Sequence, residues 1–136
     1  MTRAYVLDAN AAFDFLEGGL GAPRVKQLLM EALRQEVSVA MSVLNLGEVF
    51  YLMWEQRGDE VARNAIAELS RAPIQFIPID LSLSLKAAEI KAVHKIPYVD
   101  CVAAALAILT EAVLVTGDRD FEKLGRHASI LWIKVK

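Results

Sequence analysis

Hydrophobic positions along the chain alternate between short β-prone runs and longer stretches with helical spacing. The first apolar run ends abruptly at Asp8, and apolar residues at helical spacing follow it directly. The pattern predicts strands at residues 4–7, 37–40, 75–79, 112–115 and 130–135. It predicts helices at residues 11–16, 25–33, 43–56, 59–69, 81–93, 98–110 and 121–124. This alternation indicates an α/β fold in which helices cover both faces of a parallel sheet.

The predicted helix 98–110 is the most apolar segment of the chain. Pro97 opens it, and residues 101–109 are apolar without interruption, so we expect it to be buried on most sides. That run is far shorter than the roughly 20 residues that a membrane-spanning helix needs. The N-terminal run is broken by Asp8, too early for a signal peptide. We therefore expect no membrane segment.

The composition is typical of a folded chain. Its 136 residues are 55% hydrophobic and 24% charged, which excludes intrinsic disorder and fits a single domain covering residues 1–136. Cys101 is the only cysteine, so an intramolecular disulfide and a cysteine-rich zinc site are excluded. Nothing in the sequence calls for an oxidising compartment, and we expect a cytoplasmic protein.

Four acidic residues interrupt apolar segments, where an ionised carboxylate is rare unless it is paired or binds a metal. Asp8 and Asp118 each follow a predicted strand, so both should reach the carboxyl edge of the sheet, where ligands bind in such folds. Glu48 is the only charged residue between positions 43 and 54, and Asp100 lies in the first turn of the apolar helix. These four are the candidate functional residues.

Each of these acids also has a structural interpretation. Asp8 could cap the helix that follows it, and Asp100 could stabilise a helix N-terminus through the helix dipole. Asp118 could form a turn beside Gly117. Glu48 could be neutralised by a lysine or arginine that is distant in the sequence.

Together the four acids favour a bound cation, because clustered like charges are unfavourable without one. Hard divalent ions prefer oxygen ligands, so Mg²⁺ or Mn²⁺ is expected. Asn10 and Thr116 could add neutral oxygens to such a site. His94 and His127 lack the spacing of paired zinc ligands, so zinc is disfavoured.

Four segments resemble the PIN domains found in VapC toxins of type II toxin–antitoxin systems. They are residues 6–10, 42–49, 98–105 and 114–121, and they span nearly the whole chain. The resemblance implies a three-layer α/β/α sandwich around a central, mostly parallel five-stranded sheet. It also implies an endoribonuclease that depends on Mg²⁺ or Mn²⁺, with Asp8, Glu48, Asp100 and Asp118 converging on the metal.

The resemblance assigns roles within this site. Asp8, Asp100 and Asp118 would be metal ligands, directly or through water, and Glu48 a further ligand or the base that orients the attacking water. One or two ions would lower the pKa of that water and stabilise the leaving oxygen. Asp120 matches a more variable acidic position. Roles in contacting the substrate or supporting the ligands fall to Asn10, Thr116, Asp120 and Arg119.

Basic residues must contact the RNA phosphates. Arg119, beside the site, is the best candidate, and the others available are Arg24, Lys26, Arg57, Lys123 and Arg126. Tyr98 could stack on a base, although core packing is the alternative.

The resemblance also implies a homodimer and a small antitoxin partner. Helix 43–56 is apolar around more of its circumference than one sheet face requires. Phe50, Met53 and Trp54 could therefore cover a partner, or they could lie under the neighbouring helix 59–69.

Three other functions compete with this one. A phosphoacceptor receiver domain is also a small α/β fold with Mg²⁺ at strand ends, but it has no need for Glu48 within an apolar helix. A PIN domain could also act in RNA processing without being a toxin, or serve as an adaptor without catalysis.

The formal net charge of −2 argues at first against a nucleic-acid partner. If four of the 17 acids are committed to metal, 13 remain against 15 basic residues, and the rest of the surface is mildly basic.

Overall fold

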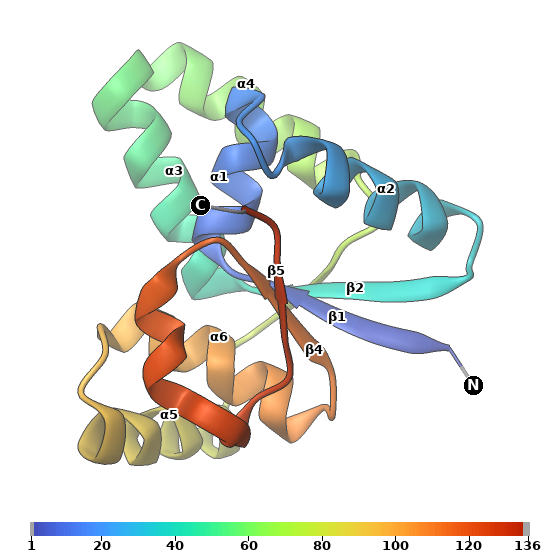
Figure 1. Cartoon of the computed structure of the whole chain (residues 1–136). Coiled ribbons are helices and arrows are strands. Elements are labelled where there is room, and N and C mark those ends of the chain that lie inside the picture. Colours follow the sequence, from blue (N-terminus) through green and yellow to red (C-terminus); the bar gives the residue numbers. More distant parts are fainter. Residues whose placement is uncertain (1, 135–136) are drawn as a thin grey trace.

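The computed structural model describes residues 2–134 and shows a five-stranded sheet with helices on both faces (Figure 1). The strands lie in the order β3-β2-β1-β4-β5, and every pairing is parallel. The strands are β1 (Arg3–Leu7), β2 (Val37–Ser42), β3 (Gln75–Ile77), β4 (Val113–Thr116) and β5 (Ile130–Trp132). The helices are α1 (Ala9–Glu17), α2 (Ala22–Leu33), α3 (Val43–Arg57), α4 (Asp59–Arg71), α5 (Leu81–His94), α6 (Tyr98–Leu109) and the 3-10 helix η1 (Arg119–His127). The predicted α/β fold is confirmed.

Several element boundaries differ from the prediction, two of them for a clear physical reason. The strand predicted at 75–79 ends at Ile77, because Pro78 has no N–H to donate to a neighbouring strand. The first helix begins at residue 9, because Asp8 caps it. The last strand ends at Trp132, and Val135, to which it was predicted to run, lies outside the described residues.

Side chains from successive strand residues point to opposite faces of the sheet and build two cores. Val6 and Leu114 face α5, α6 and η1 on one side. Leu7 and Val115 face α1 and α2 on the other side. Because the central strands are covered on both faces, they are apolar without alternation, as is usual in parallel sheets.

A third core lies beside the sheet, between α1 and the hairpin of α3 and α4, which projects from the rest of the molecule (Figure 1). It decides between the two interpretations of the surplus apolar residues of α3. Met53 is buried against α4, whereas Trp54 is 44% exposed and Phe50 is half-buried. Packing under α4 therefore accounts for Met53 and leaves Trp54 on the surface.

Helix α6 is buried as its composition predicts, and its residues 101–107 are all inaccessible. Its alanines let it approach both the sheet and α5 closely. Within the described part of the chain, no single helix is long and apolar enough to cross a membrane. Only α5 and α6 taken together have the length and the apolar composition of a membrane-spanning segment, and the two helices are bent by 117° relative to each other.

A fifth acid, Asp14 on α1, is buried but was not singled out by the sequence pattern. Its Oδ2 accepts a hydrogen bond of 2.6 Å from the Gly21 backbone N–H, and its Oδ1 lies 3.3 Å from Nζ of Lys134. A Cβ at Gly21 would come within 2.8 Å of the same carboxylate. Asp14 thus joins the start of α2 and the C-terminal segment to α1, and it has a cation partner.

Replacing Asp14 with alanine should lower the free energy of unfolding by about 2 kcal/mol, because it leaves the Gly21 N–H and Lys134 without their partner. Thermal denaturation should show a melting temperature lower by about 5 °C or more. Asp14→Asn should cost less, because its amide oxygen can still accept from Gly21. A melting temperature of Asp14→Ala within 1 °C of the parent would contradict this account.

Candidate metal centre

The sheet topology brings two of the predicted acids together. From β1 the chain moves outward to β2 and β3, and it then returns to the other side of β1 to form β4 and β5. The carboxyl ends of β1 and β4 therefore adjoin at the point where the winding reverses, which is where ligands bind in such sheets. Asp8 follows β1 and Asp118 follows β4.

Asp8 is 2% exposed and is held by two hydrogen bonds. Its Oδ1 accepts from the Ala11 N–H at 2.7 Å, which caps α1, and its Oδ2 accepts from the Thr116 hydroxyl. The capping interpretation of Asp8 is therefore correct, and it is compatible with a place in the site.

Neutral hydrogen bonds also fix the loop that follows β4. The Thr116 oxygen accepts from the Asp118 N–H at 3.0 Å while its hydroxyl donates to Asp8. The Asn10 Oδ1 accepts from the Gly117 N–H at 2.9 Å. Asn10 and Thr116 thus hold the loop that carries Asp118, and Thr116 also bonds to Asp8.

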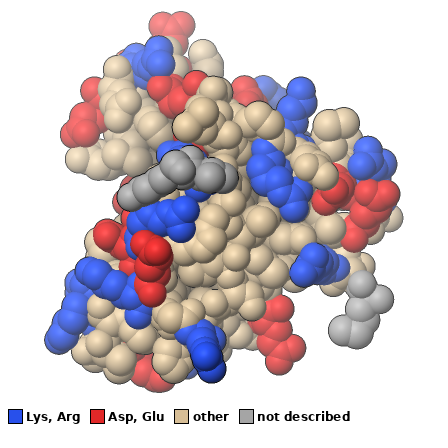
Figure 2. Space-filling view, in the orientation of Figure 1, with Lys and Arg blue, Asp and Glu red and all other residues tan. Residues whose placement is uncertain are grey.

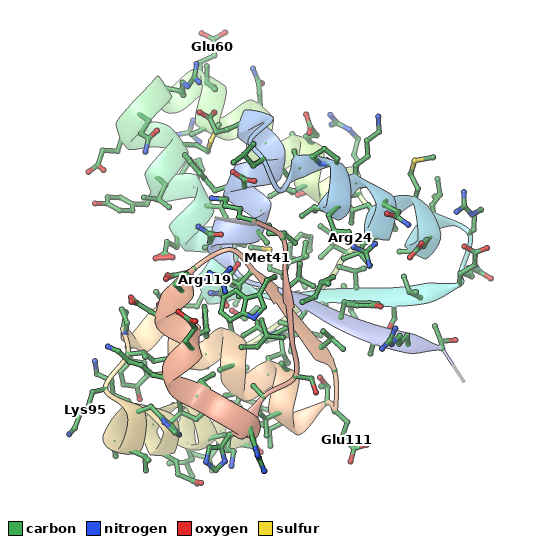
Figure 3. The ribbon with its side chains drawn as sticks, viewed as in Figure 1. Arg24, Met41, Glu60, Lys95, Glu111 and Arg119 are labelled. Atoms are coloured by element: carbon green, nitrogen blue, oxygen red, sulfur yellow. The ribbon has the colours of Figure 1, made fainter. Side chains whose placement is uncertain are left out.

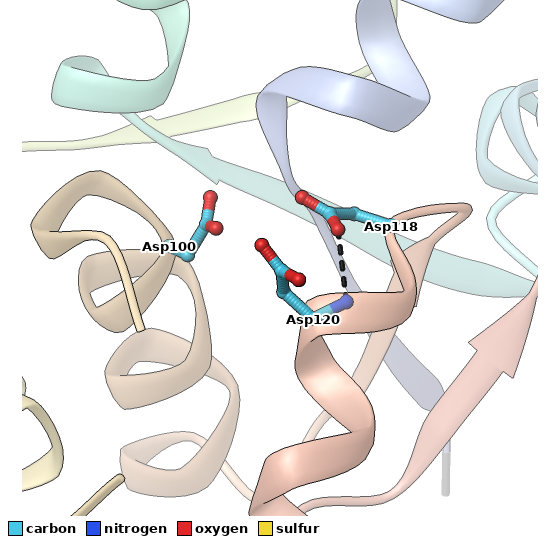
Figure 4. Close-up of side chains that lie close together, drawn as sticks. All are labelled: Asp100, Asp118 and Asp120. Carbon is cyan, nitrogen blue, oxygen red and sulfur yellow. Dashed lines mark hydrogen bonds between the residues drawn. The ribbon is translucent and has the colours of Figure 1, made fainter. Parts of the chain in front are cut away.

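Three carboxylates converge in front of this loop. Asp100, Asp118 and Asp120 each offer an oxygen, and these oxygens all lie within 4.8 Å of one another. Figure 4 shows Asp100 pointing from α6 toward the other two across the gap, and Asp118 accepting from the Asp120 N–H at 2.9 Å. Asp100 lies in the first turn of α6, as its structural interpretation requires. Asp118 caps η1, a role that differs from the turn beside Gly117 that was its structural alternative.

Glu48 approaches the same cluster from α3 and is half-buried. Burial raises its pKa, and the charge of Asp118 raises it further. Among residues 2–134, none of the ion pairs includes Glu48, Asp8, Asp100, Asp118 or Asp120. The alternative of a lysine or arginine partner for Glu48 thus finds no support in the described part of the chain.

Burial and mutual repulsion perturb the two most buried acids. Burial raises the pKa of Asp8 to about 7, against the lowering effect of the Thr116 and Ala11 hydrogen bonds. The pKa of Asp100 also rises to about 7, first because of burial and then because of the charges of Asp118 and Glu48. The folded chain therefore assembles carboxylates whose ionised forms need a counter-charge.

These residues fit a hard divalent ion. Among the described residues, the group that could hold an ion consists of the carboxylates of Asp100, Asp118 and Asp120 and includes no nitrogen or sulfur ligand. Such a donor set suits Mg²⁺ or Mn²⁺ and not zinc. Asp8 and Glu48, which were expected to converge with them, lie outside this group, although charges of the group raise the pKa of both acids. A bound cation would also supply the missing counter-charge.

Arg119 lies at the start of η1, near the carboxyl ends of the strands (Figure 3). Its guanidinium stacks 4.4 Å from the centre of the Trp132 ring, and its Nη2 donates to the Lys134 carbonyl at 3.4 Å. Arg57, another predicted RNA contact, pairs with Glu17 at 2.8 Å, and its side chain remains 55% exposed. Tyr98 is 47% exposed at the start of α6, so core packing does not account for it.

Basic and acidic groups are scattered over the face shown in Figure 2 and form no single basic patch there.

The structure adds one residue that the sequence interpretation missed. Asn45 is fully buried on α3, one turn before Glu48, and its side chain bonds to the backbone of α6 at Val99. The sequence signal that could have revealed Asn45 is its spacing, three residues after the cap Ser42 and three before Glu48.

Comparison with known proteins places this arrangement in a family. A family model for the PIN domain matches residues 5–127. The chain belongs to the PIN domain family. The predicted resemblance is confirmed, and the receiver-domain alternative is excluded. A search of curated protein sequences finds no match.

Several solved structures share this PIN fold. The VapBC2 structure from Rickettsia felis, bound to a promoter DNA fragment, has a TM-score of 0.75 at 17% identity, covering 94% of this chain and 97% of that one. VapBC-1 from nontypeable Haemophilus influenzae has a TM-score of 0.71 at 21% identity, covering 96% and 98%. VapC20 from Mycobacterium tuberculosis, a sarcin–ricin loop cleaving toxin, has a TM-score of 0.70 at 20% identity, covering 89% and 95%. At these identities the likeness establishes the fold.

Without metal, the acids should destabilise this PIN domain as they ionise. The folded-state pKa of Asp100, about 7, lies above its ordinary value of 3.8, so the wild-type chain loses stability as the pH rises through this range. In chelator at pH 8, Asp100→Asn should therefore raise the melting temperature by about 3 °C or more. The lost helix-dipole interaction of about 0.5 kcal/mol is the smaller effect.

The stability difference should shrink as the pH is lowered from 8 to 4, because Asp100 of the folded wild type then holds the proton and that of the unfolded chain, with a pKa of 3.8, is close to half protonated. Added Mn²⁺ should stabilise the wild type and leave the variant nearly unchanged. Glu60→Gln, at an exposed position on α4 (Figure 3), is the control and should show neither effect. An Asp100→Asn variant that is less stable than the wild type at pH 8 would refute the repulsion account.

Proposed function

We propose that this PIN domain is an endoribonuclease that depends on Mg²⁺ or Mn²⁺ and hydrolyses RNA phosphodiester bonds. The observation that supports the proposal best is the group of carboxylates that meet where the sheet winding reverses and that have no cation partner among residues 2–134. The VapC20 toxin, which shares the fold, is described as cleaving the sarcin–ricin loop, an RNA element.

A bound divalent ion supplies Lewis acidity, which lowers the pKa of water and stabilises negative charge on the leaving oxygen. Asp8, Asp100 and Asp118 are the residues proposed to hold it. Asp8 is kept in place by the Thr116 hydroxyl and the Ala11 N–H, so its carboxylate need not reorganise when charge develops.

Glu48 is suited to a different task. It is only half-buried, and its raised pKa brings the carboxylate closer to the range of an effective general base. We assign it the role of orienting the attacking water and accepting its proton. Arg119 is proposed to contact an RNA phosphate, because Trp132 and the Lys134 carbonyl hold its guanidinium at the edge of the site.

Purified protein with Mn²⁺ or Mg²⁺ should cleave RNA and leave DNA of the same sequence intact. Asp100→Asn and Asp118→Asn should each reduce the initial rate at least about 1,000-fold, because both remove charge that holds the ion. The Glu60→Gln control should cleave like the wild type, and chelator should stop every sample. Cleavage that survives chelator or either aspartate substitution would exclude this metal-dependent mechanism.

We further propose that the protein is the toxin of a type II toxin–antitoxin system, a homodimer that binds a small antitoxin. The support is the shared fold with proteins solved as VapBC complexes. An apolar hollow of about 550 Å³ between α3 and α4, lined by Val43, Leu46, Phe50 and Ile66 among others, offers room for partner side chains. Leu81, Leu85 and Val93 are exposed on α5, and we assign this helix to the homodimer interface.

Co-expression with the small gene adjacent to this one should yield a complex whose mass exceeds that of the free dimer and which no longer cleaves RNA. Trp54→Asp should weaken that complex at least about tenfold, because it places a charge at the apolar rim of α3. Leu85→Asp should instead halve the mass of the free protein and leave antitoxin binding in place. Free protein and no complex would favour an RNA-processing nuclease over a toxin.

A further inference from the structure

We propose that Asn45 is a positioning residue that ties α3 to α6 and thereby sets the distance between Glu48 and Asp100. The inference rests on the proposed metal-dependent function, since it gives Asn45 a part in preparing the same site. Asn45 lies outside the acidic cluster, and its side chain bonds across the contact between α3 and α6.

The Asn45 side chain is fully buried, and both polar ends of its amide are bonded. The Oδ1 accepts from the Ser42 hydroxyl at 2.5 Å, and the Nδ2 donates to the Val99 carbonyl at 3.2 Å. The Ser42 oxygen also accepts from the Asn45 backbone N–H at 3.0 Å. Ser42 ends β2 and caps α3, so one short network joins a strand and two helices.

The amide has one favourable orientation in this network. If it were flipped, its oxygen would face the Val99 carbonyl, and two acceptors would meet in a buried place. In the observed orientation, the Ser42 hydroxyl has an acceptor for its proton, and the Val99 carbonyl has a donor. The network therefore fixes the rotation of the Asn45 side chain and the separation of the helices that it joins.

The two ends of this link lie next to two of the acids. Asn45 precedes Glu48 by one turn of α3, and Val99 immediately precedes Asp100 on α6. The charge of Glu48 raises the pKa of Asp100, so the two carboxylates lie within range of each other's charge. A shift of α3 along α6 would change their separation directly, and the hydrogen bond from Asn45 to Val99 opposes that shift.

A hydrogen bond between neutral groups suits the contact between α3 and α6. The acids repel one another, which pushes α3 and α6 apart whenever no cation is bound. A lysine or arginine at position 45 would hold the helices, but its charge would also compete with the metal ion for the carboxylates. An asparagine resists the repulsion without neutralising the site.

The test compares Mn²⁺ binding with stability. Asn45→Leu keeps the number of side-chain heavy atoms and removes both hydrogen bonds, and Asn45→Ala removes side-chain volume as well. The control is Asp80→Ala, which removes the side-chain cap of α5, a hydrogen bond from the Leu83 N–H at 2.8 Å. The charge of Asp80 is not among those that raise the pKa of Asp8, Glu48 or Asp100. Mn²⁺ affinity is measured by calorimetry, and melting temperatures are measured in chelator.

The Mn²⁺ dissociation constant should rise about tenfold or more in Asn45→Leu, as is typical when a residue that orients metal ligands is lost. The control should stay within about twofold of the wild type, even if its melting temperature falls as far. RNA cleavage by Asn45→Leu should be weak at limiting Mn²⁺ and recover in part at saturating Mn²⁺. Ser42→Ala, which frees the amide to rotate, should weaken Mn²⁺ binding to a smaller extent and remains informative if both Asn45 variants fail to fold.

Unchanged Mn²⁺ affinity in the folded Asn45 variants, or in Ser42→Ala if those do not fold, overturns the positioning role. Equal losses of affinity in Asp80→Ala and Asn45→Leu overturn it too, because they would reflect general destabilisation. A wild-type chain that binds no Mn²⁺ overturns the proposed function itself, and the role of Asn45 with it. The binding data for the wild type and the variants thus separate the two failures.

Discussion

Repulsion among carboxylates is the constraint on which the rest of this structure depends. Asp8, Glu48, Asp100, Asp118 and Asp120 come from different parts of the chain and meet without a cation partner among the described residues. Burial adds to the cost of ionising Asp8 and Asp100. The fold must supply enough favourable packing to hold these groups together, and the fully buried residues of β1, β4 and α6 do so directly beneath them.

The contrast with Asp14 separates a structural acid from those of the site. Asp14 is about as buried as Asp100, yet Lys134 neutralises it and the Gly21 N–H bonds to it. Within the described part of the chain, the site acids accept hydrogen bonds only from neutral groups, namely the Thr116 hydroxyl and the backbone N–H groups that Asp8 and Asp118 cap. A buried carboxylate with its own cation completes its interactions within the chain, whereas one held by neutral donors keeps its charge for a ligand.

The sequence was informative where local pattern determines structure and uninformative where a distant partner does. The strands, the helices and the positions of Asp8 and Asp118 at strand ends follow from periodicity, because parallel sheets gather their carboxyl ends at one edge. The partnership of Asp14 with Lys134 joins opposite ends of the chain, and the bond from Asn45 to Val99 crosses between helices. Neither partner is visible in a local pattern, so both residues were missed.

The distribution of charge bears on how an RNA would be recognised. With the five site acids set apart, 12 acidic residues remain against 15 basic ones, a small excess that is scattered over the face shown in Figure 2. An excess of this size gives weak long-range attraction, and salt screens it within about 10 Å. Contacts close to the acids must then supply most of the selectivity for a substrate. In the proposed function Arg119 meets that requirement, because its guanidinium is already stacked on Trp132 and would lose little side-chain freedom on binding a phosphate.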